Sequence, residues 1–279
     1  MRLAGALSII IFAGLLRAQN GQEGSRPGWP CVAGRPVDPT YIDTSESTGG
    51  LLFLFQKNEV AQASLVMSAS HTHPSTLLRA LGNLNGSRDF EFPVDSSIES
   101  LLVLVSLQCR NAISVFRPTG SEVTKTSGAL SVDLQAGRIL RIDQAETGQW
   151  RVRLEGTGLF VVSILARADI GLTRVAFPPN SDPLKEKEYL RRLNTPLFGV
   201  RQNVEIQLSG HVSGLRLQLV DAAGDRISDM EALEPIAEGA YRTTITPQVE
   251  RFRILVTGTD ASARPFQRMY PVLYRAQPK

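Results

Sequence analysis

The fold class of this 279-residue chain follows from the stretch LLVLVSL at Leu101–Leu107. Its odd-numbered positions form one apolar face, and Leu102 and Leu104 form a second. Successive side chains of a β-strand point to opposite faces, so a strand that is apolar on both faces belongs in the middle of a covered sheet. The sequence therefore predicts a buried central β-strand at this place.

Strands of the same period surround this stretch. At residues 149–154 the side chains of Trp150, Val152 and Leu154 alternate with two arginines, which predicts one inward face and makes Trp150 a core anchor. Further strands are predicted on similar grounds at residues 90–92, 112–116, 131–134, 138–142, 160–165, 175–177, 204–208, 215–219, 239–245, 251–257 and 266–274. Turns with Gly or Pro separate them at intervals of about 8–12 residues, which is typical of β-sandwiches.

Breaks in this rhythm divide the chain into units. The predicted fold class is mainly β, with two tandem antiparallel β-sandwich domains of the Ig-like or jelly-roll-like kind. The first sandwich is expected at residues 88–179 and the second at residues 197–279. A charged connector at residues 180–196, which begins just after the pair Pro178-Pro179, separates them.

A short αβ remnant is predicted ahead of the two sandwiches, at residues 41–87. Within it, Leu51–Phe55 is a short apolar strand and Lys57–Met67 is a helical stretch. Residues 19–40 are rich in Gly, Pro and Gln, which indicates a flexible arm.

The first 18 residues have the pattern of a secretory signal peptide. Arg2 supplies the positive start, Leu3–Leu16 is apolar, and the small Ala18 suits the position before the cleavage site. The apolar run is shorter than the roughly 20 residues that a membrane-spanning helix needs. An uncleaved anchor is the alternative, but we expect a secreted, extracellular chain with no membrane span after signal cleavage.

Entry into the secretory pathway would give meaning to two further features. The triplet Asn85-Gly86-Ser87 is an acceptor motif for N-glycosylation, in a stretch rich in Gly and Asn that is predicted to be a loop. Cys31 and Cys109 are the only cysteines, and an oxidising compartment permits a disulfide between them. Cys109 could equally be a packed thiol at the end of a buried strand, so the pairing stays open.

Composition excludes several classes of protein. Hydrophobic residues make up 42% and charged residues 20% of the chain, which excludes a collagen and a wholly disordered protein. The net charge is +3, from 30 basic and 27 acidic residues of both signs along the chain, so no nucleic-acid partner is indicated. Three histidines are few for a metal enzyme.

Several short motifs occur in an order that is specific to a group of extracellular proteins. Thr48–Phe53, followed by Lys57–Val60, resembles the closing strand and helix of a von Willebrand factor A domain. Later motifs resemble the region after the A domain in hemicentins and in von Willebrand factor A domain-containing protein 7. These motifs are Phe92–Ile98, Pro118–Gly120, Gly148–Val152, Gly156–Gly158, Val256–Asp260 and Phe266–Arg268.

This resemblance covers roughly Asp38 to Tyr274. It implies a secreted, non-enzymatic extracellular protein built from β-sandwich modules. Almost all of an A domain is missing from the chain, so metal-dependent adhesion by such a domain is not part of the expectation.

Two short motifs contain residues that bind metal ions in other proteins, but each lacks part of what a complete metal site needs. Asp43–Ser47 matches Asp-x-Ser-x-Ser, a cation-site pattern, but no buried strand precedes it, and a polar loop is expected. His71 and His73 would share one face of a strand and could bind Zn²⁺. No third ligand lies near them in the sequence, so a solvated loop is expected there as well.

Two groups of charged residues are candidate ligand sites. Asp221, Asp225 and Asp229 could hold Ca²⁺, although a β-turn explains them better. Basic side chains that could bind sulfated glycans gather in the predicted connector: Lys185, Lys187, Arg191 and Arg192. Acidic residues interrupt that group, so we expect a solvated connector.

The sequence therefore predicts a secreted non-enzymatic protein of the matrix or adhesion type, acting through contacts with extracellular proteins or matrix components. A carbohydrate- or calcium-binding β-sandwich module is the alternative, and a secreted hydrolase is a third. No nucleophile elbow, zinc-protease helix or phosphate-binding loop appears in the sequence. No catalytic, metal-binding or cofactor-binding residue is assigned.

Overall fold

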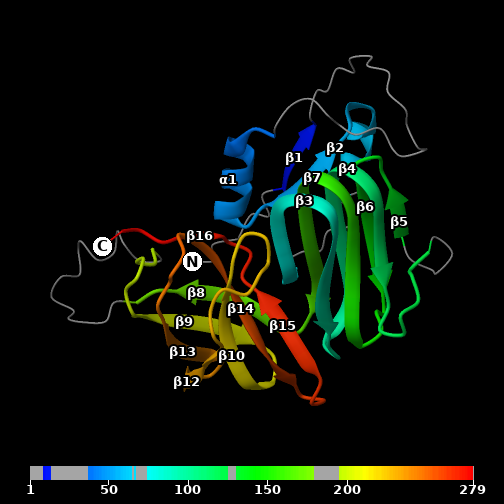
Figure 1. The fold of residues 1–279 in the computed structure, drawn as a ribbon. Helices are drawn as coiled ribbons and strands as arrows, with labels where there is room; N and C mark the ends of the chain where they lie inside the picture. The colour runs from blue at the N-terminus through cyan, green and yellow to red at the C-terminus, as the bar shows by residue number, and fades with distance from the viewer. Residues whose placement is uncertain are drawn as a thin grey trace.

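A computed structural model describes residues 9–13, 37–64, 66, 74–124, 130–178 and 195–278. The fold is mainly β, as predicted, with three antiparallel sheets, a two-stranded parallel pair and one short α-helix near the N-terminus (Figure 1). Within these residues, no helix has the length and apolar character that crossing a membrane requires.

The first unit is one five-stranded sheet with the strand order β3-β7-β4-β6-β5. Its strands are β3 (Ser75–Val94), β4 (Ile98–Phe116), β5 (Leu130–Asp133), β6 (Gly137–Asp143) and β7 (Gly148–Ala168). Strand β4 lies in the middle, and Leu101–Leu107 is buried on both faces, which confirms the prediction of a central strand. One face carries the main core, in which Trp150 is fully buried and donates its indole N–H to the Glu146 carbonyl at 2.8 Å.

Strands β4 and β7 are longer than the sequence predicts, because each runs through a bend that was expected to be a turn. Two shifts of register separate the halves of β4, between Leu107 and Cys109 and again between Arg110 and Ala112. Opposite them in β7, Gly156 and Gly158 have φ angles of 146° and 91°, which glycine adopts without strain. The ladder therefore continues around the bend, and Figure 1 shows these strands curving together.

The N-terminal elements are β1 (Ile9–Ala13), α1 (Pro39–Thr48), β2 (Leu51–Phe55) and a 3₁₀ helix, η1 (Lys57–Gln62). Helix α1 lies where the end of an arm and a polar loop were expected. The Asp38 side chain caps its first turn through the N–H of Thr40, Pro39 opens it, and Gly49 ends it at φ 74°. Strand β2 was predicted correctly, and the helical stretch expected over 57–67 is also found: η1 spans 57–62, and helical conformation continues at Ala63, Ser64 and Val66.

Strand β2 covers the second face of the first sheet. Leu51, Phe53 and Phe55 pack there with Leu102 and Leu104 of β4. The two apolar faces of β4 are thus each covered, which is the physical reason for the double alternation in its sequence.

The second unit is a sandwich of two antiparallel sheets. One has the order β11-β10-β14-β15, with β16 also paired to β14, and the other has the order β12-β13-β9-β8. The bounds are β8 (Gly171–Ala176), β9 (Gln202–Ser209), β10 (Val212–Val220), β11 (Glu231–Ala232), β12 (Glu234–Ala237), β13 (Ala240–Ile245), β14 (Arg251–Asp260), β15 (Pro265–Met269) and β16 (Tyr274–Arg275). The inward face includes Val204, Ile206, Leu217, Ile254 and Phe266.

The boundaries between the units differ from those expected. Strand β3 begins at Ser75, before the predicted start of the first sandwich at residue 88. Strand β8, expected in the first sandwich, pairs with β9 in the second. The chain changes unit between Ala168 and Gly171, so the predicted connector at 180–196, of which 195–196 are described, does not mark the change.

Candidate functional site

The two units are joined by apolar packing and by buried ion pairs. Val220, Leu255 and Met269 of the second sandwich pack into the main core of the first unit. Beside them, Glu46 of α1 lies between Arg79 of β3 and Arg253 of β14. All three side chains are buried, with exposed fractions of 3% or less.

The Glu46 cluster has most of its hydrogen-bonding groups satisfied. Arg79 donates to one carboxylate oxygen of Glu46 at 3.1 Å and to the carbonyls of Gly50 and Pro271 at 2.7 and 3.2 Å. Arg253 donates to the other carboxylate oxygen and to the Ala222 carbonyl. Burial lowers the pKa of Arg79 to about 10 and that of Arg253 to about 9, so both remain charged at neutral pH.

A second buried ion pair joins the units at another point. Asp95, in the turn after β3, binds both terminal nitrogens of Arg268 in β15, at 2.7 and 3.2 Å, and both side chains are fully buried. Arg268 also donates to the carbonyl of Ile170, at the crossing between the units. These groups hold the two units in one orientation, because separating them would leave buried charges without partners.

Near these pairs, the carboxylate of Asp260 accepts hydrogen bonds from the Ser96 hydroxyl at 2.6 Å and the Ser96 N–H at 2.9 Å. Burial by itself would raise the pKa of Asp260. Hydrogen bonds from Ser96 and from the N–H groups of Arg264 and Ser262 outweigh this and bring that pKa below its ordinary value.

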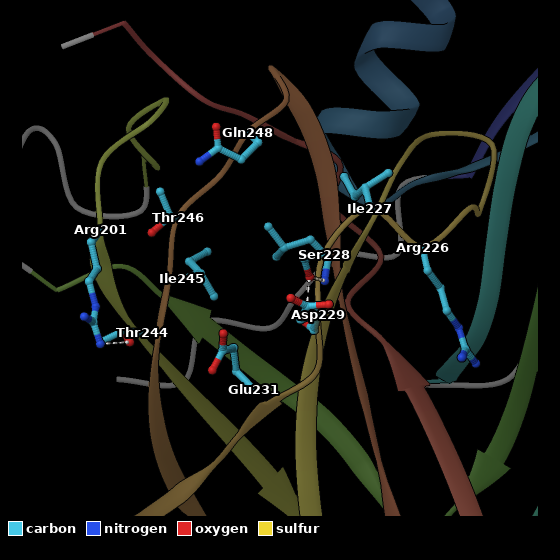
Figure 2. A pocket seen from close by; sticks show the side chains of 11 residues that line it. Arg201, Arg226, Ile227, Ser228, Asp229, Glu231, Thr244, Ile245, Thr246 and Gln248 are labelled. Atoms are coloured by element: carbon cyan, nitrogen blue, oxygen red, sulfur yellow. Dashed lines mark hydrogen bonds between the residues drawn. The ribbon is translucent and has the colours of Figure 1, made fainter.

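A recess of about 800 Å³ opens at the end of the second sandwich that carries the 221–229 loop (Figure 2). Its floor is apolar and comes from Leu219, Ile227 and Ile245. Its rim is polar and includes Arg201, Arg226, Ser228, Asp229, Glu231, Thr244, Thr246 and Gln248. Polar residues outnumber apolar ones in this lining by eight to three, so the recess suits a polar or charged group of a ligand.

The charged side chains on this rim differ in whether they have partners within the described residues. Arg201 donates to the Thr244 hydroxyl at 3.3 Å, and in the view of Figure 2 Ile245 lies between this pair and Asp229. Asp229 and Glu231 are exposed, and within the described residues neither carboxylate forms an ion pair. The recess can therefore offer two carboxylates, several hydroxyls and an apolar floor to a ligand.

The segment that leaves the recess forms an exposed edge of the second sandwich. We call Asp229–Glu238 the acidic edge, since it carries four carboxylates: Asp229, Glu231, Glu234 and Glu238. All four are exposed, and so are the apolar side chains of Met230 and Ile236. Strand β12, within it, is the last strand of its sheet and pairs only with β13 among the described residues. Exposed apolar side chains framed by charges can mark a contact surface, whereas Glu234 and Pro235 on the edge strand itself oppose its pairing with another strand.

A second, smaller hollow of about 370 Å³ lies in the first unit. Its guanidinium groups, from Arg110 and Arg138, donate mainly to backbone carbonyls, for example Gly137 at 2.7 Å and Val123 at 2.7 Å, and approach Asp133. These arginines hold the Glu122–Thr124 segment and the end of β5 against the sheet. Asn111 and Thr124 add polar groups to the lining.

The structure separates the residues that the sequence suggested as metal ligands. The Asp43–Ser47 motif is helical: Asp43 pairs with exposed Arg251, and Glu46 is in the buried cluster, so this is not a polar loop. Asp221 accepts from the N–H of Asp225 in a turn, and Asp225 pairs with Arg88. Asp229 lies apart, on the recess rim.

Other predicted residues fall partly outside the described chain. His71, His73, Lys185, Lys187, Arg191, Arg192 and Cys31 lie outside the described residues. Cys109 is half-buried in β4, and its pairing with Cys31 stays a prediction. Within the described ranges, no three His, Cys, Asp or Glu side chains are grouped to hold a metal ion.

Asn85 is exposed, as a glycan acceptor must be, but it lies within β3 and not in a loop. It pairs with Thr157 at the bend of β7, and the next residue, Gly86, has a φ of 110° and open space around its Cα. A Gly-rich stretch can thus be a bent strand as well as a loop.

Sequence reasoning missed the recess and both buried ion pairs. The arginines left a signal, since Arg79 and Arg253 each interrupt an apolar strand pattern, at Leu77–Ala80 and Phe252–Val256. A cation inside an apolar strand needs a buried partner. The identity of that partner is not encoded locally, because Glu46 lies 33 residues from Arg79 and 207 from Arg253.

Comparison with known proteins finds a family match that spans all five strands of the first unit. Residues 75–169 match the family model described as hemicentin galactose-binding domain-like. The resemblance to hemicentins is confirmed for this region, whereas the resemblance to von Willebrand factor A domain-containing protein 7 stays a prediction. No curated protein matches the chain.

Solved structures show only distant likeness. A lipase, BlEst2 of Bacillus licheniformis in its propeptide form, is 13% identical with a TM-score of 0.35, over 77% of this chain and 46% of the lipase. A DUF4785 family protein of Legionella pneumophila is 10% identical with a TM-score of 0.38, over 74% of this chain and 65% of that one. Likenesses at this level carry no argument about function.

Proposed function

We propose that the chain is a secreted, non-enzymatic extracellular protein of the matrix or adhesion type that acts through protein–protein contacts. The observation that carries this proposal is the acidic edge, where Met230 and Ile236 are exposed among four carboxylates, two of which, Asp229 and Glu231, line an open recess. A basic protein surface would complement it, with a lysine or arginine side chain in the recess near Asp229 and Glu231.

The rigid junction supports the same proposal. Buried ion pairs at Glu46 and Asp95 keep the two units in a fixed orientation, so a partner that contacts the acidic edge and the first unit together binds without the entropic cost of ordering two domains. Residues 75–169 match the hemicentin galactose-binding domain-like family model, and the sequence predicts a signal peptide. Both features favour an extracellular setting.

The experiment is affinity capture from conditioned medium and solubilised matrix with the chain as bait. The double substitution Met230→Ser/Ile236→Ser should lower recovery of a specific partner at least tenfold. Leu130→Ser is the matched control, because Leu130 and Ile236 have the same exposed fraction, 45%, and lie in different units. Equal recovery by all three proteins would reject the acidic edge as the contact surface.

Secretion has its own test at Asn85. Production in mammalian cells should give a glycosylated protein in the medium, and Asn85→Gln should increase its gel mobility. The same mobility for both proteins would remove the glycan from the proposal, and retention of the chain inside the cell would contradict secretion itself.

Carbohydrate binding is the second candidate, favoured by one observation. The smaller hollow, lined by Asn111, Glu122 and Thr124, lies inside the region that matches a galactose-binding domain-like model. Glycan arrays probed with the wild-type chain and with Asn111→Ala would promote this candidate if a saccharide bound saturably and the variant lost it. Titration calorimetry with Ca²⁺ tests the other part of this alternative, in which the sandwich binds calcium.

A further inference from the structure

Every side chain of strand β2 is buried. Leu51, Phe53 and Phe55 face the first sheet, while Leu52 and Leu54 face a separate apolar cluster that contains Val161. Strands covered on both faces in this way are typical of the interior of a parallel sheet, where each strand has neighbours along its edges.

The strand is firmly attached to the sheet beneath it. The ring of Phe53 lies over Gly137, where a Cβ would come within 2.6 Å of the ring. The N–H of Leu54 donates to the Ser106 hydroxyl of β4 at 3.2 Å. Strand β2 is therefore attached to β4 and β6 by contacts that do not involve the strand beside it.

Among the described strands, the one beside β2 in its sheet is β1, which pairs with it in parallel through all five residues, from Ile9↔Leu51 to Ala13↔Phe55 (Figure 1). Ile9–Ala13 lies within the segment that the sequence predicts to be removed as a signal peptide. Removal would open the edge of β2 between two apolar clusters, and unpaired backbone groups in such surroundings are costly.

We infer that in the secreted protein this edge of β2 binds an apolar extended segment of another polypeptide, in parallel with β2. The inference rests on the proposed secretion, and it adds a second contact surface whose chemistry differs from that of the acidic edge. Addition of a strand to a free sheet edge is a recurrent mode of peptide recognition.

The surroundings of β2 define the segment that fits. Its residues must be apolar at every position, because the clusters on both faces consist of aliphatic and aromatic side chains, among them Leu102, Leu165 and Val161. Its length is about that of β1, whose sequence IIIFA is rich in β-branched residues that favour strands. A charged segment would lose its hydration there without a partner.

The test uses the protein secreted by mammalian cells and a labelled peptide that carries the Ile9–Ala13 sequence between polar flanks. Intact mass first shows whether residues 1–18 have been removed. Fluorescence anisotropy should then show saturable binding of the peptide, and a control peptide with Ile11→Pro should bind at least tenfold more weakly. The full 279-residue chain, produced without passage through the secretory pathway, should not bind because its own β1 fills the edge.

A second variant guards against misfolding of the shortened protein. The full-length chain with Ile11→Pro loses no residues but cannot maintain β1, and it should bind the wild-type peptide. A cleaved, folded protein that fails to bind would overturn the inference and leave secretion intact. A secreted protein that retains residues 1–18 would also overturn it, and a chain that is never secreted would overturn the proposed function along with it.

Discussion

At the junction of the two units, the carboxylates of Glu46 and Asp95 are buried and bound by arginines, whereas at the free end of the second sandwich Asp229 and Glu231 face solvent without an ion pair within the described residues. Both regions set carboxylates beside apolar side chains. They differ in whether the partner of each carboxylate belongs to the same chain.

This difference separates charges that maintain the fold from charges that are available to a ligand. A buried ion pair often adds little net stability compared with an apolar pair, but removal of one partner leaves an uncompensated charge and is strongly destabilising. An exposed carboxylate without a cation contributes little to the fold. Substitutions in the two regions should therefore have opposite effects on stability and on binding.

The largest expected effect follows from Glu46→Ala. It leaves the guanidiniums of Arg79 and Arg253 buried without their anion and should destabilise the protein by roughly 3 to 5 kcal/mol. Urea unfolding measures it. Asp43→Ala in the same helix is the control, since its exposed pair with Arg251 should be worth about 0 to 1 kcal/mol. Equal losses for both variants would contradict a special role for the junction.

Trp150→Ala removes apolar packing from the core of the first unit, whereas Glu46→Ala removes a buried charge from the junction. A fully buried indole should cost roughly 3 to 5 kcal/mol on truncation. The loss should have no link to the junction, so the losses of Trp150→Ala and Glu46→Ala should be additive in the double variant, as measured by thermal or urea unfolding. A change below about 0.5 kcal/mol would show that the ring is not in the core.

Acid should weaken the junction through the carboxylate of Asp260. Because the pKa of Asp260 is lower in the folded protein than in the unfolded chain, its stabilising effect is present above the unfolded value of about 3.9 and is lost as pH falls through the folded value. The stability of the wild type should therefore fall more steeply below about pH 4 than that of Asp260→Asn. Parallel acid curves for the two proteins, from urea unfolding at several pH values, would argue against this contribution.

The smallest expected effect on stability belongs to the acidic edge. Met230→Ser/Ile236→Ser should change the free energy of unfolding by less than about 0.5 kcal/mol, because both side chains are already exposed. Loss of partner capture at unchanged stability would mark the edge as a contact surface. A large destabilisation would instead show that these side chains pack into the fold.

Local patterns in the sequence were sufficient to predict where the strands lie, but not where they end. The alternations at Leu101–Leu107 and Trp150–Leu154 correctly predicted strands and their buried faces. The bends could not be predicted from the pattern. A glycine such as Gly156 indicates a turn when only the sequence is known, and only the register across the sheet shows that the strand continues through it. The assignment of β8 to the second sandwich also depended on pairing with a strand about 30 residues further along the chain.

The sequence by itself determined the mainly β fold, because period-two alternation specifies which side chains can be buried. It also pointed to hemicentins through short ordered motifs, part of which the family match supports. Only the tertiary structure decided which charges meet: Glu46, Arg79 and Arg253 come from separate elements, and Asp229 and Glu231 join residues around 201 and 244–248 at one recess. Contacts between distant residues depend on how the sheets pack together, and no local period encodes that packing.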